Sequence, residues 1–386
     1  MHILVLPSSY PTKDAPIRGI FFKEQAVALK NSGHDVGVIY SETRRITGIN
    51  LNTLKEYHFQ KSFYREEGIN VLRLHGWNVL MMRNSLGINL WIKQTIQLYN
   101  DYVKRFGKPD IIHVHCGLYG GMAAKLIKDK YSVPYIITEH SSNVLNNALD
   151  NFHKDMLVEA YNNANSLISV GKALKLQMAK YTDNNINVIP NIVNTEEFVV
   201  KKNKKNKFRF ISVSFLIENK RVDLTIKAFK RVYDRNKNVE LYIGGDGSCR
   251  QSLEELVKEL NLEDSVKFLG KVDRKDMPDF LSNGDCFVLP SEYETFGVVY
   301  IEALACGLPI ITTKCGGPED FYNEDLGYMI NVNDEDALYE AMNKVIDEKG
   351  KFSNEEISEY IKARFSNEVI VKEIEEIYSL VLNNNL

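Results

Sequence analysis

The stretch SEYETFGVVYIEALACGLP, residues 291–309, is the most informative part of this sequence. One apolar run, residues 286–289, precedes it, and another, residues 310–313, follows it. Between these runs, residues 298–305 are almost all apolar and predict a buried helix that the following Gly-Leu-Pro ends. A strand, a tight loop, a buried helix and a second strand make up a βαβ unit, which is the building block of parallel sheets.

Two carboxylates, Glu294 and Glu302, flank the Phe296-Gly297 turn in this stretch. At about 1.5 Å per residue, their separation spans about 12 Å, which is the length of a nucleoside diphosphate-sugar. We therefore expect Glu294 at the mouth of the loop and Glu302 about two turns into the helix, with the helix N-terminus facing phosphate groups between them. Open α/β sheets bind ligands at this carboxyl end of their strands.

The chain has 386 residues, which is too long for one ordinary hydrophobic core and indicates two domains. Its composition, 44% hydrophobic and 26% charged, is that of a globular protein, and no apolar run reaches the length of about 18 residues that a membrane span requires. The opening MHILVLPSSYP lacks a basic region and predicts a first strand rather than a signal peptide. Five dispersed cysteines indicate a reducing cytoplasm without disulfides.

Strand-like and helix-like segments alternate along the first half of the chain, which predicts a parallel sheet covered on both faces. The strand-like segments are residues 2–7, 35–40, 69–74, 110–115, 134–139, 166–170 and 187–189. The helical patterns cover residues 21–32, 91–106, 120–131, 152–163 and 172–180. The alternation restarts with strand-like segments at 208–214, 240–244, 266–269 and 285–289 and a helix at 222–236.

The lysine-rich run KKNKKNK, residues 201–207, separates the two halves and predicts a solvated linker. No aromatic residue interrupts the run, so we expect no nucleic-acid binding there. The sequence therefore predicts an α/β protein with one Rossmann-like domain at residues 1–195, a linker at 196–207 and a second Rossmann-like domain at 208–365. Residues 366–386 predict a helix that packs back on the first domain.

Smaller motifs carry polar groups near the expected strand ends. His140 follows the strand 134–139, and Arg18-Gly19 lies in the loop after the first strand, where a glycine lets the backbone approach a phosphate. The glycines at 244–247 do not match G-x-G-x-x-G and predict a tight turn instead. The HVHC motif at 113–116 places two histidines on one face of a strand, but too few further ligands lie nearby in the sequence to predict a metal site.

These features together resemble the retaining glycosyltransferases of family 4, which have the GT-B fold of two doubly wound Rossmann-like domains with a central cleft. The resemblance covers nearly the whole chain, and the two-glutamate motif with its Pro-Ser prefix carries it most specifically. The other matching pieces are GHDV at 33–36, IPNIVNTEEF at 189–198, Lys220, FLGKV at 268–272 and CGGPED at 315–320.

The resemblance implies three catalytic residues. His140 is similar to the histidine beside the anomeric carbon of the donor sugar, Glu294 to the carboxylate that holds sugar hydroxyls, and Lys220 to the cation at the diphosphate. It also implies front-face attack with retention of configuration, in which a donor phosphate oxygen takes the acceptor's proton. Such enzymes need no metal, because cationic side chains and helix dipoles neutralise the leaving diphosphate.

The resemblance implies further contacts with the nucleotide-sugar donor. Glu302 is expected to bind the ribose, and the backbone N–H groups of Phe296, Gly297 and Val298 to contact the donor near its sugar. The remaining contacts are the backbone of Gly19 at the diphosphate, and Lys271 and Val272 at the base.

Two places depart from the family pattern: the residues before Lys220, and residues 191–194, which read Asn-Ile-Val-Asn instead of the usual Asn-Gly-Val-Asp. Family members usually carry Gly-Arg before the lysine, where this chain has Ser214-Phe215. The loss of one charge-assisted contact costs about 1.5–3 kcal/mol of donor affinity. Arg221, directly after Lys220, is the candidate to compensate, although adjacent helical residues point about 100° apart.

We therefore predict a cytoplasmic, retaining, metal-independent glycosyltransferase of capsule or other surface-polysaccharide biosynthesis, which uses a UDP-sugar in preference to a GDP-sugar. We expect its acceptor to be a saccharide or a lipid-linked intermediate. The alternatives are a nucleotide-sugar 2-epimerase and a nucleotide-sugar-binding module that has lost catalysis, for which Phe215 is the supporting residue. The apolar stretch 77–91 is a candidate for peripheral membrane contact, and its alternative is a set of helices packed on the first domain.

Overall fold

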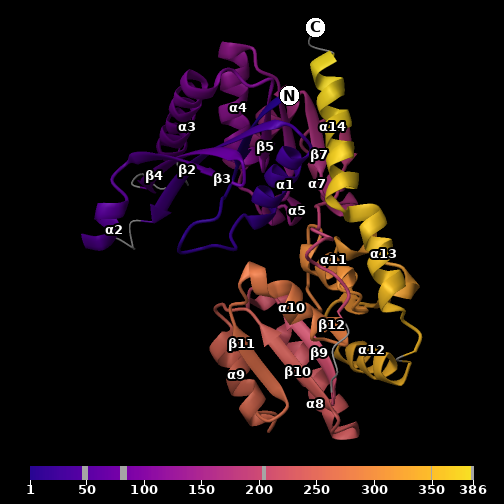
Figure 1. Ribbon diagram of the computed structural model, residues 1–386. Helices are drawn as coiled ribbons and strands as arrows, with labels where there is room; N and C mark the ends of the chain where they lie inside the picture. Colours follow the sequence, from indigo (N-terminus) through magenta and orange to yellow (C-terminus); the bar gives the residue numbers. More distant parts are fainter. Residues whose placement is uncertain (46–50, 79–84, 202–205, 349, 384–386) are drawn as a thin grey trace. The chain divides into compact units, whose positions relative to one another are not determined.

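The computed structural model describes residues 1–45, 51–78, 85–201, 206–348 and 350–383, and it forms two compact units (Figure 1). Unit 1 comprises Met1–Pro190 and Ile370–Leu386, and unit 2 comprises Asn191–Val369. Unit 1 therefore ends before the predicted limit at residue 195, and the predicted linker 196–207 belongs to unit 2. Residues 202–205 of that linker lie outside the described residues.

Unit 1 is built on an eight-stranded sheet in the order β3-β4-β2-β1-β5-β6-β7-β8. Neighbouring strands are parallel except β3, which is antiparallel to β4. The strands are β1 (His2–Pro7), β2 (Asp35–Arg45), β3 (Gln60–Glu66), β4 (Ile69–Asn78), β5 (Ile111–His115), β6 (Tyr135–Glu139), β7 (Ser166–Ser169) and β8 (Ile186–Val188). The chain winds outward from β1 in both directions, as a doubly wound sheet requires.

Strand β3 is the one strand of this sheet that the sequence analysis missed. It forms a hairpin with β4 through Glu67 and Gly68, whose φ angles of 48° and 80° are those of a two-residue type I′ turn. The alternation is hidden in the sequence because the aromatic Phe63 lies on the exposed side, whereas the polar Ser62 and Glu66 lie on the more buried one. An edge strand with one solvated face tolerates this arrangement.

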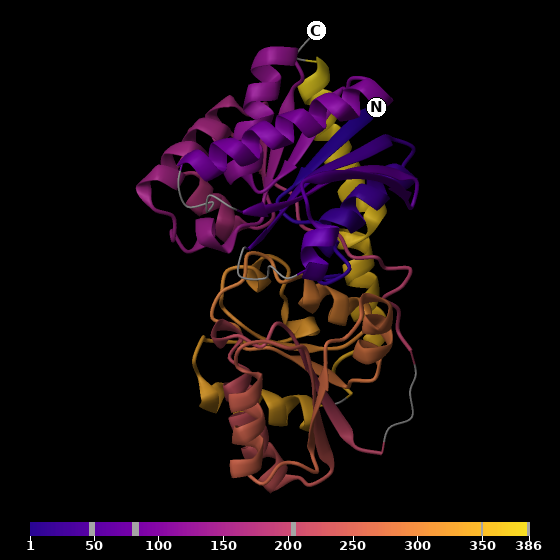
Figure 2. The ribbon, with the colours of Figure 1, turned by 90° about the vertical axis from the view of Figure 1, so that its left-hand side faces the viewer.

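Helices cover both faces of this sheet (Figure 2), and β5 and β6 are accordingly buried along their whole length. The last helix belongs to unit 1 from Ile370 onward: its Tyr378 hydroxyl lies 2.6 Å from His113 Nδ1, and its Glu375 lies 2.7 Å from His34 Nε2. The helices are α1 (Ile20–Asn31), α2 (Leu51–Glu56), α3 (Ser85–Phe106), α4 (Gly117–Tyr131), α5 (Ser142–Leu145), α6 (Asn151–Asn163), α7 (Lys172–Met178) and α14 (Asn367–Asn383).

The apolar stretch 77–91 does not present its tryptophans to solvent. Trp77 and Trp91 are buried, and their indole N–H groups donate to the backbone oxygens of Tyr57 and Ser41. Residues 79–84 of the stretch lie outside the described residues. Over the ranges that the structure describes, no helix combines the length and the apolar character needed to cross a bilayer. The two tryptophans are core residues of unit 1, so a membrane contact would have to rest on other side chains.

Unit 2 is built on a parallel, six-stranded sheet in the order β11-β10-β9-β12-β13-β14. The strands are β9 (Phe208–Val213), β10 (Val239–Gly244), β11 (Val266–Gly270), β12 (Cys286–Val288), β13 (Ile310–Thr313) and β14 (Gly327–Ile330). The helices are α8 (Val222–Arg235), α9 (Arg250–Glu259), α10 (Met277–Ser282), α11 (Val298–Ala305), α12 (Glu335–Asp347) and α13 (Asn354–Phe365), with 3₁₀ turns η2 (Glu218–Lys220), η3 (Arg274–Asp276), η4 (Pro318–Asp320) and η5 (Glu324–Leu326). The prediction of two doubly wound α/β units is confirmed.

Each sheet has one position where the winding direction reverses. In unit 1 it lies between β1 and β5, and in unit 2 between β9 and β12. The loops that leave the carboxyl ends of these strands diverge, and the space between them is where open α/β sheets bind ligands. The predicted βαβ unit around residues 291–309 is β12, α11 and β13, so its loop lies at the reversal point of unit 2.

Candidate functional site

The loops that follow β9 and β12 meet at the reversal point of unit 2. The backbone N–H of Glu292, after β12, donates to the backbone oxygen of Asn219, after β9, at 2.8 Å. This bond holds the two loops side by side at the carboxyl edge of the sheet. Lys220 and Glu294, predicted to bind the diphosphate and the donor sugar, lie one in each loop.

Lys220 and Glu294 are bonded to each other. Lys220 Nζ donates to Glu294 Oε1 at 2.7 Å, and the Ser291 hydroxyl donates to the same oxygen at 2.9 Å. The lysine and glutamate side chains are 16% and 12% exposed, so the pair is largely shielded from water but still reachable. This arrangement offers a cation and a carboxylate within one hydrogen bond of each other, which suits a ligand whose anionic group adjoins hydroxyl groups.

The loop after β12 turns directly into α11. Gly297 is the N-cap residue with φ 87°, and a Cβ there would lie 2.6 Å from the Tyr300 ring. By the geometry of a helix, the N–H groups of its first two residues, Val298 and Val299, have no intrahelical acceptor and attract anions, whereas the N–H of Tyr300 donates to the backbone oxygen of Gly297 at 3.0 Å. The Phe296 side chain is buried, so its backbone is the part that a ligand can contact.

Glu302 lies closer to the start of α11 than the sequence predicted. The helix begins at Val298, not near Glu294, so Glu302 is about one turn into the helix rather than two. The error arises because the Phe296-Gly297 turn delays the start of the helix. The rest of the chain between the two carboxylates is irregular loop.

The Glu302 carboxylate, 4% exposed, is bonded to Arg274, a residue that the sequence analysis missed. Arg274 Nη1 lies 2.5 Å from Glu302 Oε1, and the guanidinium carbon lies 4.8 Å from the centre of the Phe198 ring. Burial raises the pKa of Glu302, and the charge of Arg274 opposes that rise. Arg274 follows Val272 by two residues. Its place next to the segment predicted to border the base was the signal in the sequence that could have identified it.

Arg221 is engaged by carboxylates of unit 2. Its guanidinium donates to Asp223 at 3.1 Å and to Glu292 at 3.2 Å, and the bond to Asp223 is the main reason why the pKa of Arg221 is raised. Phe215, at the position of the usual family arginine, is 62% exposed. Compensation for that arginine by Arg221 would require both ion pairs to open.

The segment predicted to border the base packs beside the turn after β10. Val272 lies against Gly244, where an added Cβ would be 2.9 Å from Val272 Cγ2. Lys271 is exposed, with its Nζ 3.9 Å from Asp246. Gly245 has φ 118°, and a Cβ there would lie 1.9 Å from the backbone oxygen of Ser214. The predicted tight turn therefore brings the loops after β9, β10 and β11 into contact.

In unit 1, the buried carboxylate of Glu139 fixes the backbone at His140. Glu139 Oε1 accepts from the backbone N–H groups of His140 and Ser141 at 3.0 and 2.9 Å. Its Oε2 accepts from the backbone N–H of Gly117 at 2.9 Å and from the Tyr161 hydroxyl at 2.7 Å. These four bonds tie the loop after β6 to the start of α4 and to α6.

The His140 side chain lies against two histidines of β5. His140 Nε2 is 3.1 Å from His115 Nδ1, and the rings of His115 and His113 stack with their centres 4.4 Å apart. Burial lowers the pKa of His113 to about 3, and burial also holds the pKa of His115 well below its usual value. Both histidines of β5 are therefore neutral at physiological pH.

Gly19 is the N-cap residue of α1, with φ 74°. A Cβ at this position would lie 2.4 Å from the backbone oxygen of Ser9, so only glycine lets the loop after β1 close on itself here.

Among the residues described in the structure, no three or more His, Cys, Asp or Glu side chains gather in a group that could hold a metal ion.

The structure thus places the predicted residues in two groups, one in each unit. Unit 1 contributes Gly19 and His140 from the loops after β1 and β6. Unit 2 contributes Lys220, Arg221, Lys271, Val272, Glu294, Phe296, Gly297, Val298 and Glu302 from the loops after β9, β11 and β12 and from α11.

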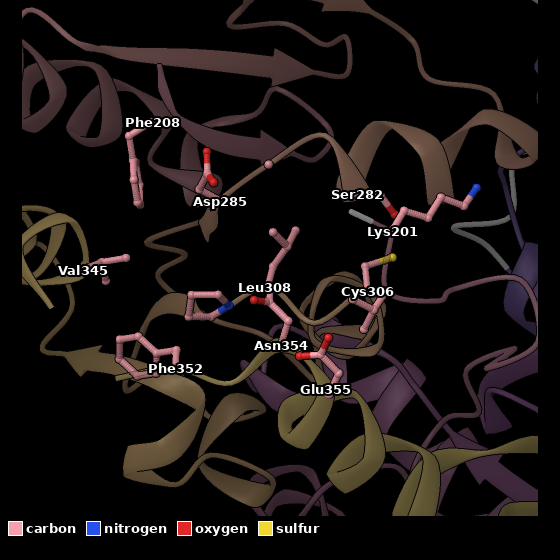
Figure 3. A pocket seen from close by; sticks show the side chains of 13 residues that line it. Lys201, Phe208, Ser282, Asp285, Cys306, Leu308, Val345, Phe352, Asn354 and Glu355 are labelled. Atoms are coloured by element: carbon pink, nitrogen blue, oxygen red, sulfur yellow. The ribbon is translucent and has the colours of Figure 1, made fainter. Parts of the chain in front are cut away.

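A cavity of about 230 Å³ in unit 2 lies away from these residues (Figure 3). Phe208 begins β9, while Asp285 and Pro309 directly precede β12 and β13, and all three line the cavity. The cavity is therefore at the amino ends of these strands, opposite the edge that carries Lys220 and Glu294.

Comparisons with known proteins match both halves of the chain. A family model described as Glycosyltransferase Family 4 matches residues 19–197, and one described as Glycosyl transferases group 1 matches residues 193–364. An uncharacterised glycosyltransferase of Methanocaldococcus jannaschii is 32% identical over 276 residues, which cover 70% of this chain and 75% of that protein.

A Bacillus subtilis protein named for teichuronic acid biosynthesis, TuaC, is 24% identical over 364 residues, which cover 89% of each chain. Among solved structures, HepE of Anabaena in complex with UDP and glucose matches with a TM-score of 0.73. It is 17% identical, and the match covers 98% of this chain and 100% of that one.

Proposed function

The chain belongs to glycosyltransferase family 4, and we propose that it is a retaining, metal-independent enzyme that transfers a sugar from a UDP-sugar to a saccharide or lipid-linked acceptor. Its two doubly wound units are those of the GT-B fold. The relative named for teichuronic acid biosynthesis supports a surface polysaccharide as the product, and the UDP and glucose bound to HepE support the choice of donor.

The Lys220–Glu294 ion pair is the observation that carries this proposal. A nucleotide sugar places a diphosphate directly beside sugar hydroxyls. When the diphosphate binds Lys220, the Glu294 carboxylate becomes available to accept hydrogen bonds from those hydroxyls, while Ser291 stays bonded to it. Both side chains are mostly shielded from water, so these charge-assisted bonds are stronger than at an open surface.

The leaving UDP needs positive charge, which this chain can supply without a metal ion. Lys220 contributes a full charge, and the N–H groups at the start of α11 contribute the positive end of a helix dipole. Phe215 replaces a second cation of the family pattern, so Lys220 carries more of this task here.

Retention follows from attack on the face of the sugar that the diphosphate leaves. The acceptor oxygen bonds to the anomeric carbon as the bond to the diphosphate oxygen breaks, and that phosphate oxygen takes the acceptor's proton. With Ser291 and the sugar hydroxyls bonded to it, Glu294 is not free to attack the anomeric carbon, which supports a mechanism without a carboxylate nucleophile. In this proposal His140 contacts the donor sugar beside the reacting carbon.

The proposal is tested by incubating the protein with UDP-glucose, UDP-galactose, UDP-N-acetylglucosamine and GDP-mannose, with and without a lipid-linked saccharide acceptor. We expect release of UDP only with acceptor, a product of the same anomeric configuration as the donor, and unchanged rates in EDTA. Glu294→Gln should lower kcat/KM by about 100-fold or more, because it removes a charged acceptor at the reacting sugar. Asp336→Asn is the matched control, because it also removes an ion-paired carboxylate of unit 2 but lies on α12.

Each part of the proposal has an outcome that contradicts it. Interconversion of nucleotide sugars without acceptor would identify a 2-epimerase, and binding without turnover would identify a binding module. An inverted product, a rate abolished by EDTA, or activity with the GDP-sugar alone would overturn retention, metal independence or the UDP donor respectively.

A further inference from the structure

A column of polar side chains runs through the core of unit 1 to His140. Tyr378 of α14 bonds His113 Nδ1 at 2.6 Å, and the other ring nitrogen of His113 lies 2.7 Å from the hydroxyl of Thr138. His113 stacks on His115, and His115 Nδ1 is bonded to His140 Nε2. Tyr378, His113 and His115 are at most 1% exposed.

The His115–His140 bond couples the protonation patterns of the two rings. A neutral imidazole has one N–H group and one bare nitrogen, and His115 stays neutral because it is buried. Of the two nitrogens in this bond, one must donate and the other must accept. For a neutral His140, the tautomers of His115 and His140 are therefore linked, and this link sets whether the second nitrogen of His140, Nδ1, is a donor or an acceptor.

The surroundings hold the His115 ring firmly. It packs against the His113 ring and against the Phe22 ring of α1, whose centres are 4.4 and 4.8 Å away. The next residue, Cys116, has φ 66°, a conformation that non-glycine residues adopt only when their surroundings impose it. The backbone is therefore strained directly after His115, at the junction of β5 and α4. The N–H of Gly117 at this junction donates to Glu139.

We propose that His115 is a positioning residue for His140: it fixes the plane and the single tautomer in which His140 meets the donor sugar. This inference rests on the proposed glycosyl transfer for the role of His140, but the geometry of the His115–His140 bond is independent of it. Glu139 sets the backbone of His140, and His115 sets its side chain. Such supporting partners govern the orientation of a reacting group without contacting the substrate.

Two substitutions of His115 distinguish the effect of its hydrogen bond to His140 from the effect of the size of its ring. His115→Asn keeps a polar amide near the place of Nδ1, whereas His115→Leu removes every polar atom. We expect His115→Leu to lower kcat about 10- to 100-fold, with the KM for the UDP-sugar changed less than about 3-fold, because His140 is misaligned rather than lost. His115→Asn should recover most of the lost kcat.

The control is Tyr378→Phe, one step further from His140 in the same column. It removes the hydroxyl that bonds His113 and should lower the melting temperature, as His115→Leu does, because a buried ring nitrogen loses its partner. Its kcat per folded molecule should stay at the level of the unsubstituted chain. An equal loss of kcat in Tyr378→Phe and His115→Leu would mean that core stability, not positioning, is responsible.

A measurement without substrate keeps the inference separate from the proposed function. The chain has eight histidines, so ¹⁵N labelling of histidine and two-bond ¹⁵N–¹H correlation can identify the His140 tautomer. We expect one tautomer in the unsubstituted protein and in Tyr378→Phe, and a mixture in His115→Leu. If His115→Leu keeps the single tautomer, or keeps full kcat, the inference is wrong. If the unsubstituted protein turns over no nucleotide sugar but the tautomer shift is seen, the proposed function fails and the positioning by His115 stands.

Discussion

At the scale of single residues, the central feature is that Lys220 and Glu294 form an ion pair with each other in the chain without ligand. Sequence motifs located both residues, but they could not show the bond between them. The two residues are 74 positions apart, and only the pairing of β9 with β12 brings their loops together. Arg274 was missed for the same reason, because its bond to Glu302 joins a turn after β11 to a helix after β12.

Lys220→Met should weaken UDP binding more than it weakens folding. In the proposed function the substitution removes one charged contact to the diphosphate, which is worth about 1.5–3 kcal/mol, so we expect the Kd for UDP to rise about 10- to 100-fold. Isothermal titration calorimetry measures the effect. Lys227→Met on the exposed side of α8 is the control, because it deletes the same charge from an outlying pair with Asp223. Equal affinities of the two variants would remove Lys220 from the diphosphate site.

Glu302 makes the stability of unit 2 depend on pH. Because burial raises its pKa above the usual 4.5, the folded chain keeps this proton to a higher pH than the unfolded chain does. The group therefore stabilises the fold fully below pH 4.5, and that contribution is lost as the pH rises through the folded pKa, by at most about 1.4 kcal/mol per pH unit. Relative to Glu302→Gln, the unsubstituted chain should lose thermal stability between pH 4.5 and 7.

Arg274→Met tests the cause of this pH dependence. Arg274 opposes the rise in the pKa of Glu302, so its removal should raise that pKa further and extend the loss of stability to higher pH. UDP binding by Arg274→Met should then improve as the pH rises, because only the ionised carboxylate is a full acceptor for ribose hydroxyls. Melting curves that run parallel for all three proteins across this range would contradict the assignment.

At the scale of elements, helix α11 shows how far a motif predicts local structure. The apolar residues 298–305 located the helix, and in the structure Gly297, from the predicted turn, is its N-cap residue. The predicted number of helical turns before Glu302, about two, was wrong, because the periodicity of apolar residues does not show at which residue the loop ends and the helix begins. The strand β3 was missed because one of its two aromatic residues, Phe63, faces outward, which hides the alternation of its side chains.

Gly297→Ala should lower the free energy of unfolding of unit 2 by more than the backbone strain of a positive φ alone would. An alanine at φ 87° costs about 1–2 kcal/mol, and its Cβ would also lie 2.6 Å from the ring of Tyr300. That ring cannot easily move, because it is fully buried and its hydroxyl donates to Leu289 at 2.7 Å. Overpacking of this kind costs about 1–3 kcal/mol more.

Gly270→Ala separates these two contributions. It has φ 71°, but the nearest atom to its added Cβ is the end of the flexible Arg250 side chain, at 3.4 Å. Urea unfolding should therefore give a larger loss for Gly297→Ala than for Gly270→Ala. Equal losses would show that the close approach to Tyr300 relaxes without cost.

At the scale of the whole molecule, the sequence predicted two doubly wound units but not where they divide. The residues after Pro190 resemble a linker, because polar and charged residues follow them as far as residue 207. In the structure they carry buried side chains of unit 2, namely Ile192, Val193 and Phe198, and the N–H of Val193 donates to Phe365. A few apolar residues in an irregular segment give no periodic signal, so the boundary became visible only through their burial.

The assignment of α14 to unit 1 has a test of its own, since this helix is distant in sequence from every other element of that unit. Ile374 is 1% exposed, whereas Leu380 on the same helix is 61% exposed. Ile374→Asp should destabilise unit 1 by about 3–5 kcal/mol, because a carboxylate would enter an apolar core, whereas Leu380→Asp should change stability by less than about 0.5 kcal/mol. Hydrogen exchange followed by peptide analysis should show the loss of protection in β1, β5 and β6, with α8 and β9 of unit 2 unchanged. Faster exchange in unit 2 instead would mean that α14 stabilises unit 2, and the division between the units would have to be redrawn.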